Sequence, residues 1–320
     1  MNTQIKLAII AIAIVIPLAS LAITQTNSTS NNSTNENSKL QVVASATFLY
    51  EFSQNIGKEM IDVTLLVPMG ADPHDWEPTI RDTERLQKAD MIIVNGIGYE
   101  HWLNSLELSD IAGILVDTSN GISTLDSANH DEEKHDDHAK EDGHDDEDNH
   151  NHGVLDPHIW LNPVFAQLQV KNIANALSNS DPTNKNYYQS NAAIYNQKLN
   201  LLDTKIRTEL SGCKTDFITF HDAFSYFSEE YGLTQHTIIS STDSHGDVTP
   251  KTLEHIISLA RELNIKVIFA EENTSTKISQ VIADEIGGKV LVLSPLEIVS
   301  DETYVEKMTQ NLESLKDALC

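Results

Sequence analysis

The amino-acid sequence predicts an α/β protein with two lobes, each a mostly parallel sheet flanked by helices, joined by one long rigid linking helix. Short apolar segments alternate with amphipathic helical segments in two separate blocks, which is typical of parallel sheets covered by helices. Between the blocks, a stretch of about 28 residues keeps a single helical periodicity. The chain has 320 residues, of which 40% are hydrophobic, and this length suits two domains.

The first block, residues 40–180, predicts the N-terminal lobe. Its strands are short apolar runs, expected at Leu40–Ser45, Asp62–Val67, Met91–Asn95 and Ile114–Asp117. Its helices carry apolar residues at helical spacing and are expected at Thr47–Gly57, Thr79–Ala89 and Val164–Leu177. The third strand is of the fully buried type, because apolar residues fill almost all of it.

The linking segment, residues 181–212, predicts one long helix at Pro182–Leu210. Its apolar residues recur every three or four positions, which places them on one face. They are Tyr188, Ala192, Tyr195, Leu199, Leu202, Ile206 and Leu210. A helix of this length is unusual inside a compact domain, so we expect it to be the spine between the two lobes.

The second block, residues 213–320, predicts the C-terminal lobe. Its strands are expected at Phe217–Phe220, Thr237–Ser240, Lys266–Ala270 and Lys289–Leu293. Its helices are expected at Ala223–Tyr231, Leu253–Leu263, Thr276–Ile286 and at the C-terminus. Cys213 and Cys320 lie at the two ends of this lobe, and they form either one disulfide or two free thiols.

The N-terminus predicts export. In residues 1–23, Lys6 is the only charge and Leu7–Ile23 is almost continuously apolar, so the segment is either a signal peptide or a membrane anchor. Residues 24–39 are rich in Asn, Ser and Thr and are expected to form a disordered tether. We therefore expect the protein at the cell surface or in a periplasm-like space, with a membrane tether through residues 7–23 as one option.

The charge balance excludes some partners and favours others. The chain has 21 Lys and Arg against 48 Asp and Glu, a formal net charge of -27, which would repel a nucleic acid and suits a cation. Residues 130–152 concentrate this charge in a predicted disordered loop that combines eleven acidic residues with six histidines: His130, His135, His138, His144, His150 and His152. That composition binds divalent cations weakly at several places, so we expect the loop to be an auxiliary metal-binding segment rather than an inert spacer.

Three histidines outside the loop share a similar setting. His74 in GADPHDWEPT and His158 in LDPHIWLNP each follow an Asp-Pro pair, and His221 directly follows a predicted strand. In open α/β sheets, ligand-binding residues lie beyond the carboxyl ends of strands. Three neutral imidazoles suit Zn²⁺ and leave one position for a carboxylate or a water. Binding should weaken below the ordinary histidine pKa of about 6.5.

The sequence resembles the metal-binding receptors of zinc and manganese ABC importers, the cluster A-I substrate-binding proteins. The resemblance runs in order through nearly the whole chain from Leu40 to Cys320. It is carried by GADPHDWEPT, VNGIGYEHWL, DPHIWLNP, FHDAFSYF with YGL, VIFAEENTS and LVLSPL. The histidine-rich acidic insert before DPHIW is similar to that of the zinc-selective branch.

The resemblance implies one ion held between two lobes by His74, His158 and His221, with a fourth ligand from the C-terminal lobe. The family often has Asp before Pro-Leu, where this chain has Ser294, and this difference disfavours manganese. The candidates for the fourth ligand are Glu271, Glu272, Asp75 and a water. Of these, we favour Glu271 or a water.

The predicted function is capture of Zn²⁺ outside the cell by a monomeric, non-enzymatic receptor, followed by delivery to a membrane permease with a cytoplasmic ATPase. The permease and ATPase are implied by the resemblance. One alternative is a manganese or iron receptor of the same type. Others are a zinc-dependent hydrolytic enzyme, for which three histidines and an open position would suffice, and an adhesin that uses zinc for stability.

Overall fold

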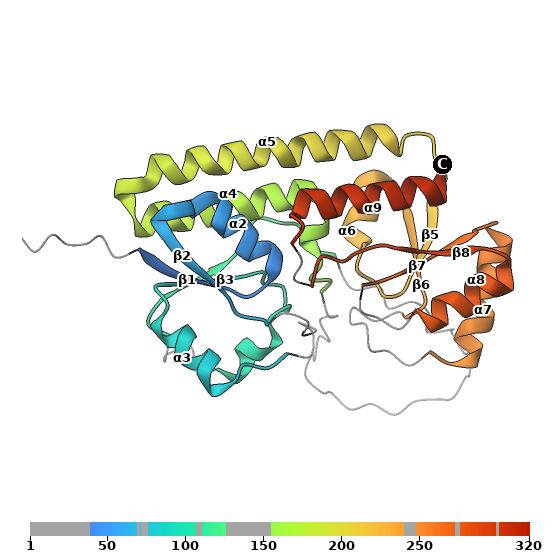
Figure 1. Cartoon of the computed structure of the whole chain (residues 1–320), viewed down its shortest axis with the longest axis horizontal. Coiled ribbons are helices and arrows are strands. Elements are labelled where there is room, and N and C mark those ends of the chain that lie inside the picture. The colour runs from blue at the N-terminus through green and yellow to red at the C-terminus, as the bar shows by residue number, and fades with distance from the viewer. Residues whose placement is uncertain are drawn as a thin grey trace, which may run out of the picture. The chain divides into compact units, whose positions relative to one another are not determined.

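The computed structural model describes residues 39–68, 71, 76–106, 111–125, 155–239, 248–272, 276–298 and 301–320. Residues 1–38, the histidine-rich loop, His74 and His245 lie outside the described residues. Residues 40–320 form one unit that contains two four-stranded parallel sheets with helices packed on them (Figure 1). The predicted fold class is confirmed. In the part of the chain that the structure describes, we find no helix with the length and apolar character needed to span a membrane.

The first sheet has the strand order β2-β1-β3-β4, and every neighbouring pair is parallel. Its strands are β1 (Leu40–Ala44), β2 (Ile61–Leu65), β3 (Met91–Val94) and β4 (Ile114–Asp117). Its main helices are α2 (Thr47–Gly57) and α3 (Ile80–Lys88). All residues of β3 are buried, as its apolar sequence predicts. A capping box begins α3, in which Thr79 and Asp82 exchange hydrogen bonds.

The second sheet repeats this arrangement with the order β6-β5-β7-β8. Its strands are β5 (Asp216–Thr219), β6 (Thr234–Thr237), β7 (Val267–Ala270) and β8 (Lys289–Val292). Its helices are α6 (Ser225–Tyr231), α7 (Pro250–Glu262), α8 (Lys277–Ile286) and α9 (Tyr304–Leu319). Since β5 and β7 are neighbours, the residues that follow these two strands lie at the same edge of the sheet.

One strand lies earlier than the sequence predicts. The apolar pair Ile238 and Ile239 suggested a strand at Thr237–Ser240, but the parallel pairing with β5 covers Thr234–Thr237. The strand is polar because it is at the edge of the sheet. The two isoleucines follow it and are buried in the core of the second lobe, which explains why their hydrophobicity was misleading.

The long helix is α5 (Lys185–Glu209), which follows a short 3₁₀ turn at Pro182–Asn184. It is 25 residues long, and its buried apolar residues are the predicted Tyr188, Ala192, Tyr195, Leu199, Leu202 and Ile206. Helix α5 packs against α4 (Pro163–Ser180), α2 and α9, and Figure 1 shows it running along α4 and α9. One hydrophobic cluster contains side chains of both sheets, so these helices join the two lobes through a shared core.

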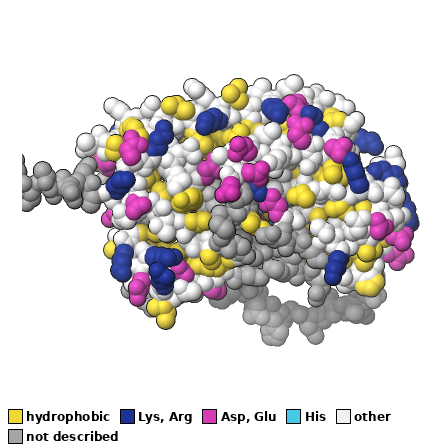
Figure 2. Space-filling view, in the orientation of Figure 1, with side chains coloured by type: hydrophobic (Ala, Val, Ile, Leu, Met, Phe, Trp, Pro, Cys, Tyr) yellow, Lys and Arg dark blue, Asp and Glu magenta, His cyan; other side chains and the backbone are white. Residues whose placement is uncertain are grey.

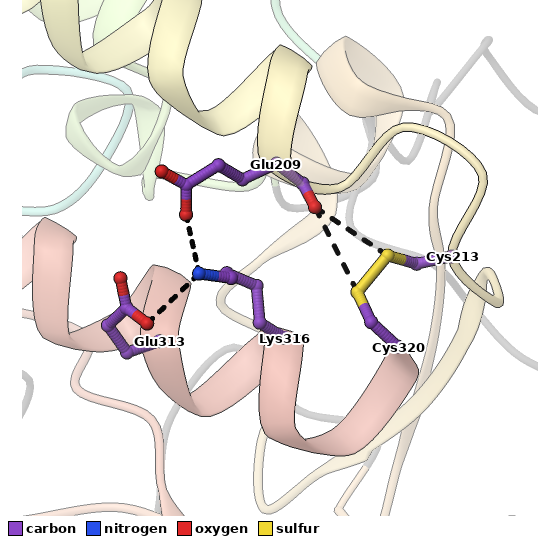
Figure 3. Close-up of a disulfide and its surroundings, with 5 residues drawn as sticks. All are labelled: Glu209, Cys213, Glu313, Lys316 and Cys320. Carbon is purple, nitrogen blue, oxygen red and sulfur yellow. Dashed lines mark hydrogen bonds and ion pairs between the residues drawn. A yellow bond between two sulfur atoms is a disulfide. The ribbon is translucent and has the colours of Figure 1, made fainter.

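A disulfide connects Cys213, just after α5, with Cys320, at the end of α9 (Figure 3). Of the two alternatives that the sequence left open, the structure has the bridge. Beside it, Lys316 Nζ lies 2.7 Å from a carboxylate oxygen of Glu209 and 3.1 Å from one of Glu313. The disulfide and the ion pair between Lys316 and Glu209 both fasten α9 to the end of α5.

Candidate metal centre

His158 is held in one orientation by Asp156 of the same Asp-Pro-His sequence. Asp156 Oδ1 accepts hydrogen bonds from the backbone N–H of His158 (2.9 Å) and from its ring Nδ1 (2.7 Å). The side chains of both residues are fully buried. Because Nδ1 donates to Asp156, Nε2 is the nitrogen that can ligate a metal.

His221 is oriented in the same way from the second sheet. It follows β5, and Glu271 follows the neighbouring strand β7. Glu271 Oε1 accepts hydrogen bonds from the backbone N–H of His221 (3.1 Å) and from its ring Nδ1 (2.5 Å). The strand order therefore places Glu271 behind the imidazole of His221, and the Nε2 atom of His221 is the one that can face a metal.

Glu297 completes a group of three metal-binding side chains with the two histidines. Ligand atoms of His158, His221 and Glu297 all lie within 4.8 Å of one another. Glu297 Oε1 is 3.5 Å from His158 Nε2, and the side chain of Glu297 is buried. The two imidazole rings are 5.3 Å apart between centroids. Two imidazoles and one carboxylate at this spacing form a donor set that suits Zn²⁺.

Glu271, which the sequence offers as a fourth ligand beside a water, accepts a hydrogen bond from the ring of His221, and Glu297 is the carboxylate grouped with the two histidines. Glu272 is directed elsewhere, toward Lys307 and Ser294. His74 and Asp75 lie outside the described residues. The sequence patterns do not single out Glu297, although it directly follows the Ser-Pro-Leu sequence that carries part of the family resemblance.

The remaining described histidines do not belong to this group. His101 lies 3.5 Å from Glu77 and is partly exposed. His236 pairs with Asp216, and His255 is exposed on α7. None of the three is among the ligands that the sequence predicts.

The electrostatics of the site favour a cation. Burial alone would lower the pKa of His158, but the charge and hydrogen bond of Asp156, reinforced by Glu297, raise it to about 10. Burial raises the pKa of the neighbouring Asp222, with a further contribution from the charge of Asp156. A site that binds a proton this strongly also stabilises a metal ion in the same position, and the two compete. The expected weakening of metal binding therefore begins well above pH 6.5.

The segment that carries Glu297 is fixed by side chains of the first lobe. Trp160 Nε1 donates to the carbonyl of Pro295 (2.8 Å), and the hydroxyl of Thr47 donates to the carbonyl of Leu296 (2.9 Å). Leu296 has a φ of 61°, in the left-handed region that is costly for a leucine. These contacts couple the position of Glu297 to the packing of the two lobes.

The sequence profile of the family described as zinc-uptake complex component A, periplasmic, matches residues 42–318. The chain belongs to this family. It is 41% identical, over 293 residues and 89% of each chain, to the high-affinity zinc uptake system protein ZnuA of Bacillus subtilis. The fold is similar to that of the metal-dependent lipoprotein YcdH of Bacillus subtilis, with a TM-score of 0.72, 38% identity and coverage of 88% of this chain and 99% of that one.

A third relative has a bound metal. The crystal structure of Zn(II)-bound AdcA from Streptococcus pneumoniae matches with a TM-score of 0.72 and 28% identity. The match covers 88% of this chain and 57% of that one, so this chain spans little more than half the length of AdcA. These comparisons confirm the family to which the sequence motifs pointed.

Proposed function

We propose that this protein is an extracytoplasmic receptor that binds one Zn²⁺ at His158, His221 and Glu297 and delivers it to an ABC-type importer. The observation that carries the proposal is the convergence of two buried imidazoles, each oriented by a carboxylate, on a third carboxylate within 4.8 Å. Membership of the zinc-uptake family and the names of the relatives support zinc as the cargo. His74 is the proposed fourth ligand, as the resemblance implies.

The donor set favours zinc over manganese. Mn²⁺ prefers a shell rich in oxygen, whereas imidazole nitrogens suit Zn²⁺. Asp156 and Glu271 each hold a histidine in the tautomer that presents Nε2, and such outer carboxylates strengthen zinc binding. The position of the family's frequent aspartate is occupied by Ser294, and Glu297 supplies the carboxylate instead.

The proposed site binds an ion and does not catalyse a reaction. Four protein ligands would fill a tetrahedral shell, whereas a catalytic zinc keeps a position for water or substrate. Because His158 and His221 are fully buried, the ion leaves only when the surrounding residues move. The permease, powered by its cytoplasmic ATPase, would cause that movement.

Two further features belong to the proposal. The protein would work as an exported monomer, either cleaved after residues 1–23 or tethered through residues 7–23. The histidine-rich loop would collect Zn²⁺ weakly near the tight site. Deleting residues 130–152 should then lower the total zinc bound in equilibrium dialysis and leave the tight equivalent unchanged, and loss of the tight equivalent would contradict the assignment of the ligands.

Competition calorimetry with a zinc chelator tests the proposal. The wild-type chain should bind one tight equivalent, and His221→Ala should abolish it. His236→Ala is the matched control, because His236 also has a carboxylate partner but lies outside the group. Retention of tight binding in His221→Ala would contradict the proposed site.

A further inference from the structure

A cavity lies between the two lobes, outside the metal group. It has a volume of about 560 Å³ and is bordered by α2, by the edge strand β2 and, between β8 and α9, by Leu296, Ile298 and residues 301–303. Among the described residues that line it, His158, His221 and Glu297 do not occur. Pockets of about 300–1,000 Å³ are typical of small-ligand sites.

One part of the cavity wall is apolar. It is formed by side chains from α2, from β2 and from the segment after β8: Tyr50, Val63, Leu65, Leu296 and Ile298. These side chains come from three separate elements, so they enclose a ligand from several directions. The wall therefore suits a compact apolar body.

The other part of the wall is acidic. Glu51, Asp301 and Glu302 line the cavity, and Lys307 is the one cation among the described lining residues. The charge of Lys307 is already compensated, because its Nζ lies 2.5 Å from Glu272 Oε1 and 3.9 Å from Glu302 Oε2. Figure 2 shows acidic side chains gathered near the middle of this face. The resulting field favours a cation and repels an anion.

The acidic residues differ in what they can offer a ligand. Both carboxylate oxygens of Glu51 accept hydrogen bonds, from the hydroxyl of Tyr195 (2.7 Å) and from the backbone N–H of Tyr304 (2.6 Å). Glu51 therefore contributes negative charge to the cavity, but its oxygens are already used in hydrogen bonds that hold the lobes together. Glu302 also has partners, since its Oε1 accepts a hydrogen bond from Gln310 Nε2 and its Oε2 lies 3.9 Å from Lys307 Nζ, so it too contributes charge. Asp301 is exposed and lies where a ligand cation could pair with it.

We propose that this cavity is a second ligand site, which takes a small organic cation: an amidinium, guanidinium or primary ammonium group on an apolar body. The apolar body lies against Tyr50, Val63 and Leu296, and the cation pairs with Asp301, while the charge of Glu302 adds to the attraction. A planar amidinium can form two parallel hydrogen bonds with one carboxylate, which makes the pairing stronger than that of an ordinary exposed ion pair. An inorganic divalent cation would leave the apolar wall unused.

The cavity also shares a wall with the metal group. Leu296 and Ile298 line the cavity, and Glu297, between them in sequence, belongs to the metal group. An occupant that moves these two side chains also moves the carboxylate of Glu297. This coupling rests on the proposed function, whereas the binding of an organic cation does not depend on it.

Calorimetry with benzamidine as the probe tests the site on the full chain. Benzamide is the matched neutral ligand and benzoate the matched anion. We expect saturable binding of one benzamidine, about tenfold tighter than benzamide, and no binding of benzoate. The double variant Asp301→Asn/Glu302→Gln should reduce benzamidine to the affinity of benzamide. Glu254→Gln/Glu262→Gln, which removes two exposed carboxylates from α7, should leave it unchanged.

The outcomes separate the two proposals. No saturable benzamidine binding up to about 10 mM, or equal binding in the Asp301→Asn/Glu302→Gln variant, would overturn the second site. If benzamidine binds as expected, its effect on the rate of Zn²⁺ transfer to a chelator tests the coupling, and an unchanged rate would overturn that part alone. If the chain binds no Zn²⁺ tightly, the proposed function fails while the benzamidine titration still decides the cavity.

Discussion

Zinc binding should displace a proton from His158, and Asp156 should control that proton. The charge and hydrogen bond of Asp156 contribute most to raising the pKa of this buried histidine to about 10. At pH 7, about three units below this pKa, removing the proton from His158 costs about 4 kcal/mol. Zinc binding must overcome this competition.

The sign of the pH effect follows directly. Raising the pH toward about 10 removes the competing proton, so log K for zinc should increase by about one per pH unit between about pH 7 and 9 from His158 alone. In Asp156→Asn the amide oxygen can still accept both hydrogen bonds of His158, but the negative charge is gone. The pKa of His158 should fall and the slope in this window should decrease.

Calorimetry in two buffers of different ionisation enthalpy measures the proton release directly. The wild-type chain should release about one proton from His158 per Zn²⁺ at about pH 7.5, and Asp156→Asn should release fewer. At high pH, where proton competition vanishes, the variant should bind zinc about 10–100-fold more weakly. Identical proton release in the two proteins would refute the role assigned to Asp156, and so would identical affinity at high pH.

Three further predictions concern the rest of the fold. Replacing Cys213 and Cys320 by Ser removes a disulfide between residues 107 positions apart. The free energy of unfolding measured in urea should fall by about 2–5 kcal/mol. An unchanged midpoint of urea unfolding would show that α9 is held by its other contacts. Burial raises the pKa of Glu100 from 4.5 to about 7 despite hydrogen bonds from Ser45, Asn95 and Gly96. Between these two pH values the folded state therefore binds more protons than the unfolded state, and the free energy of unfolding should fall by about 3 kcal/mol as the pH rises through them. Glu100→Gln should remove this pH dependence. If the dependence remains in Glu100→Gln, another group causes it. Thr47→Val removes the hydrogen bond to Leu296, which is worth about 1 kcal/mol, and should speed zinc transfer to a chelator about fivefold. Thr204→Val, at an exposed position of α5, should leave the rate unchanged. Equal rates in the Thr47→Val variant and the wild-type chain would show that Thr47 does not control the position of Glu297.

Much of the fold could be predicted because its signals are local. The face of α5 that packs on α4 and α9 follows from apolar residues such as Tyr188 and Leu199 at helical spacing. β3 follows from an uninterrupted apolar run. The position of β6 could not be predicted in this way. The hydrophobicity of Ile238 and Ile239 indicates that they are buried, but it does not distinguish a strand from the buried residues that follow one.

The proposed metal centre could be predicted only in part, because only some of its residues are marked by local sequence. His158 and His221 are marked by sequence near them, an Asp-Pro pair and a preceding strand. Glu297 reaches them through contacts between distant residues, such as the bond from Trp160 to Pro295, 135 positions apart. The sequence offered Glu271 or a water as the fourth ligand. The strand order places Glu271 beside Nδ1 of His221, and no local sequence pattern indicates that contact.

Anomalous X-ray diffraction at the zinc edge, from crystals of the zinc-loaded chain, tests the central claim most directly. We predict one strong peak about 2.0–2.2 Å from Nε2 of His158, Nε2 of His221 and a carboxylate oxygen of Glu297, with Asp156 and Glu271 remaining on the outer nitrogens of the two imidazoles. A peak coordinated by Glu271 in place of Glu297, or one that does not touch both histidines, would contradict the account.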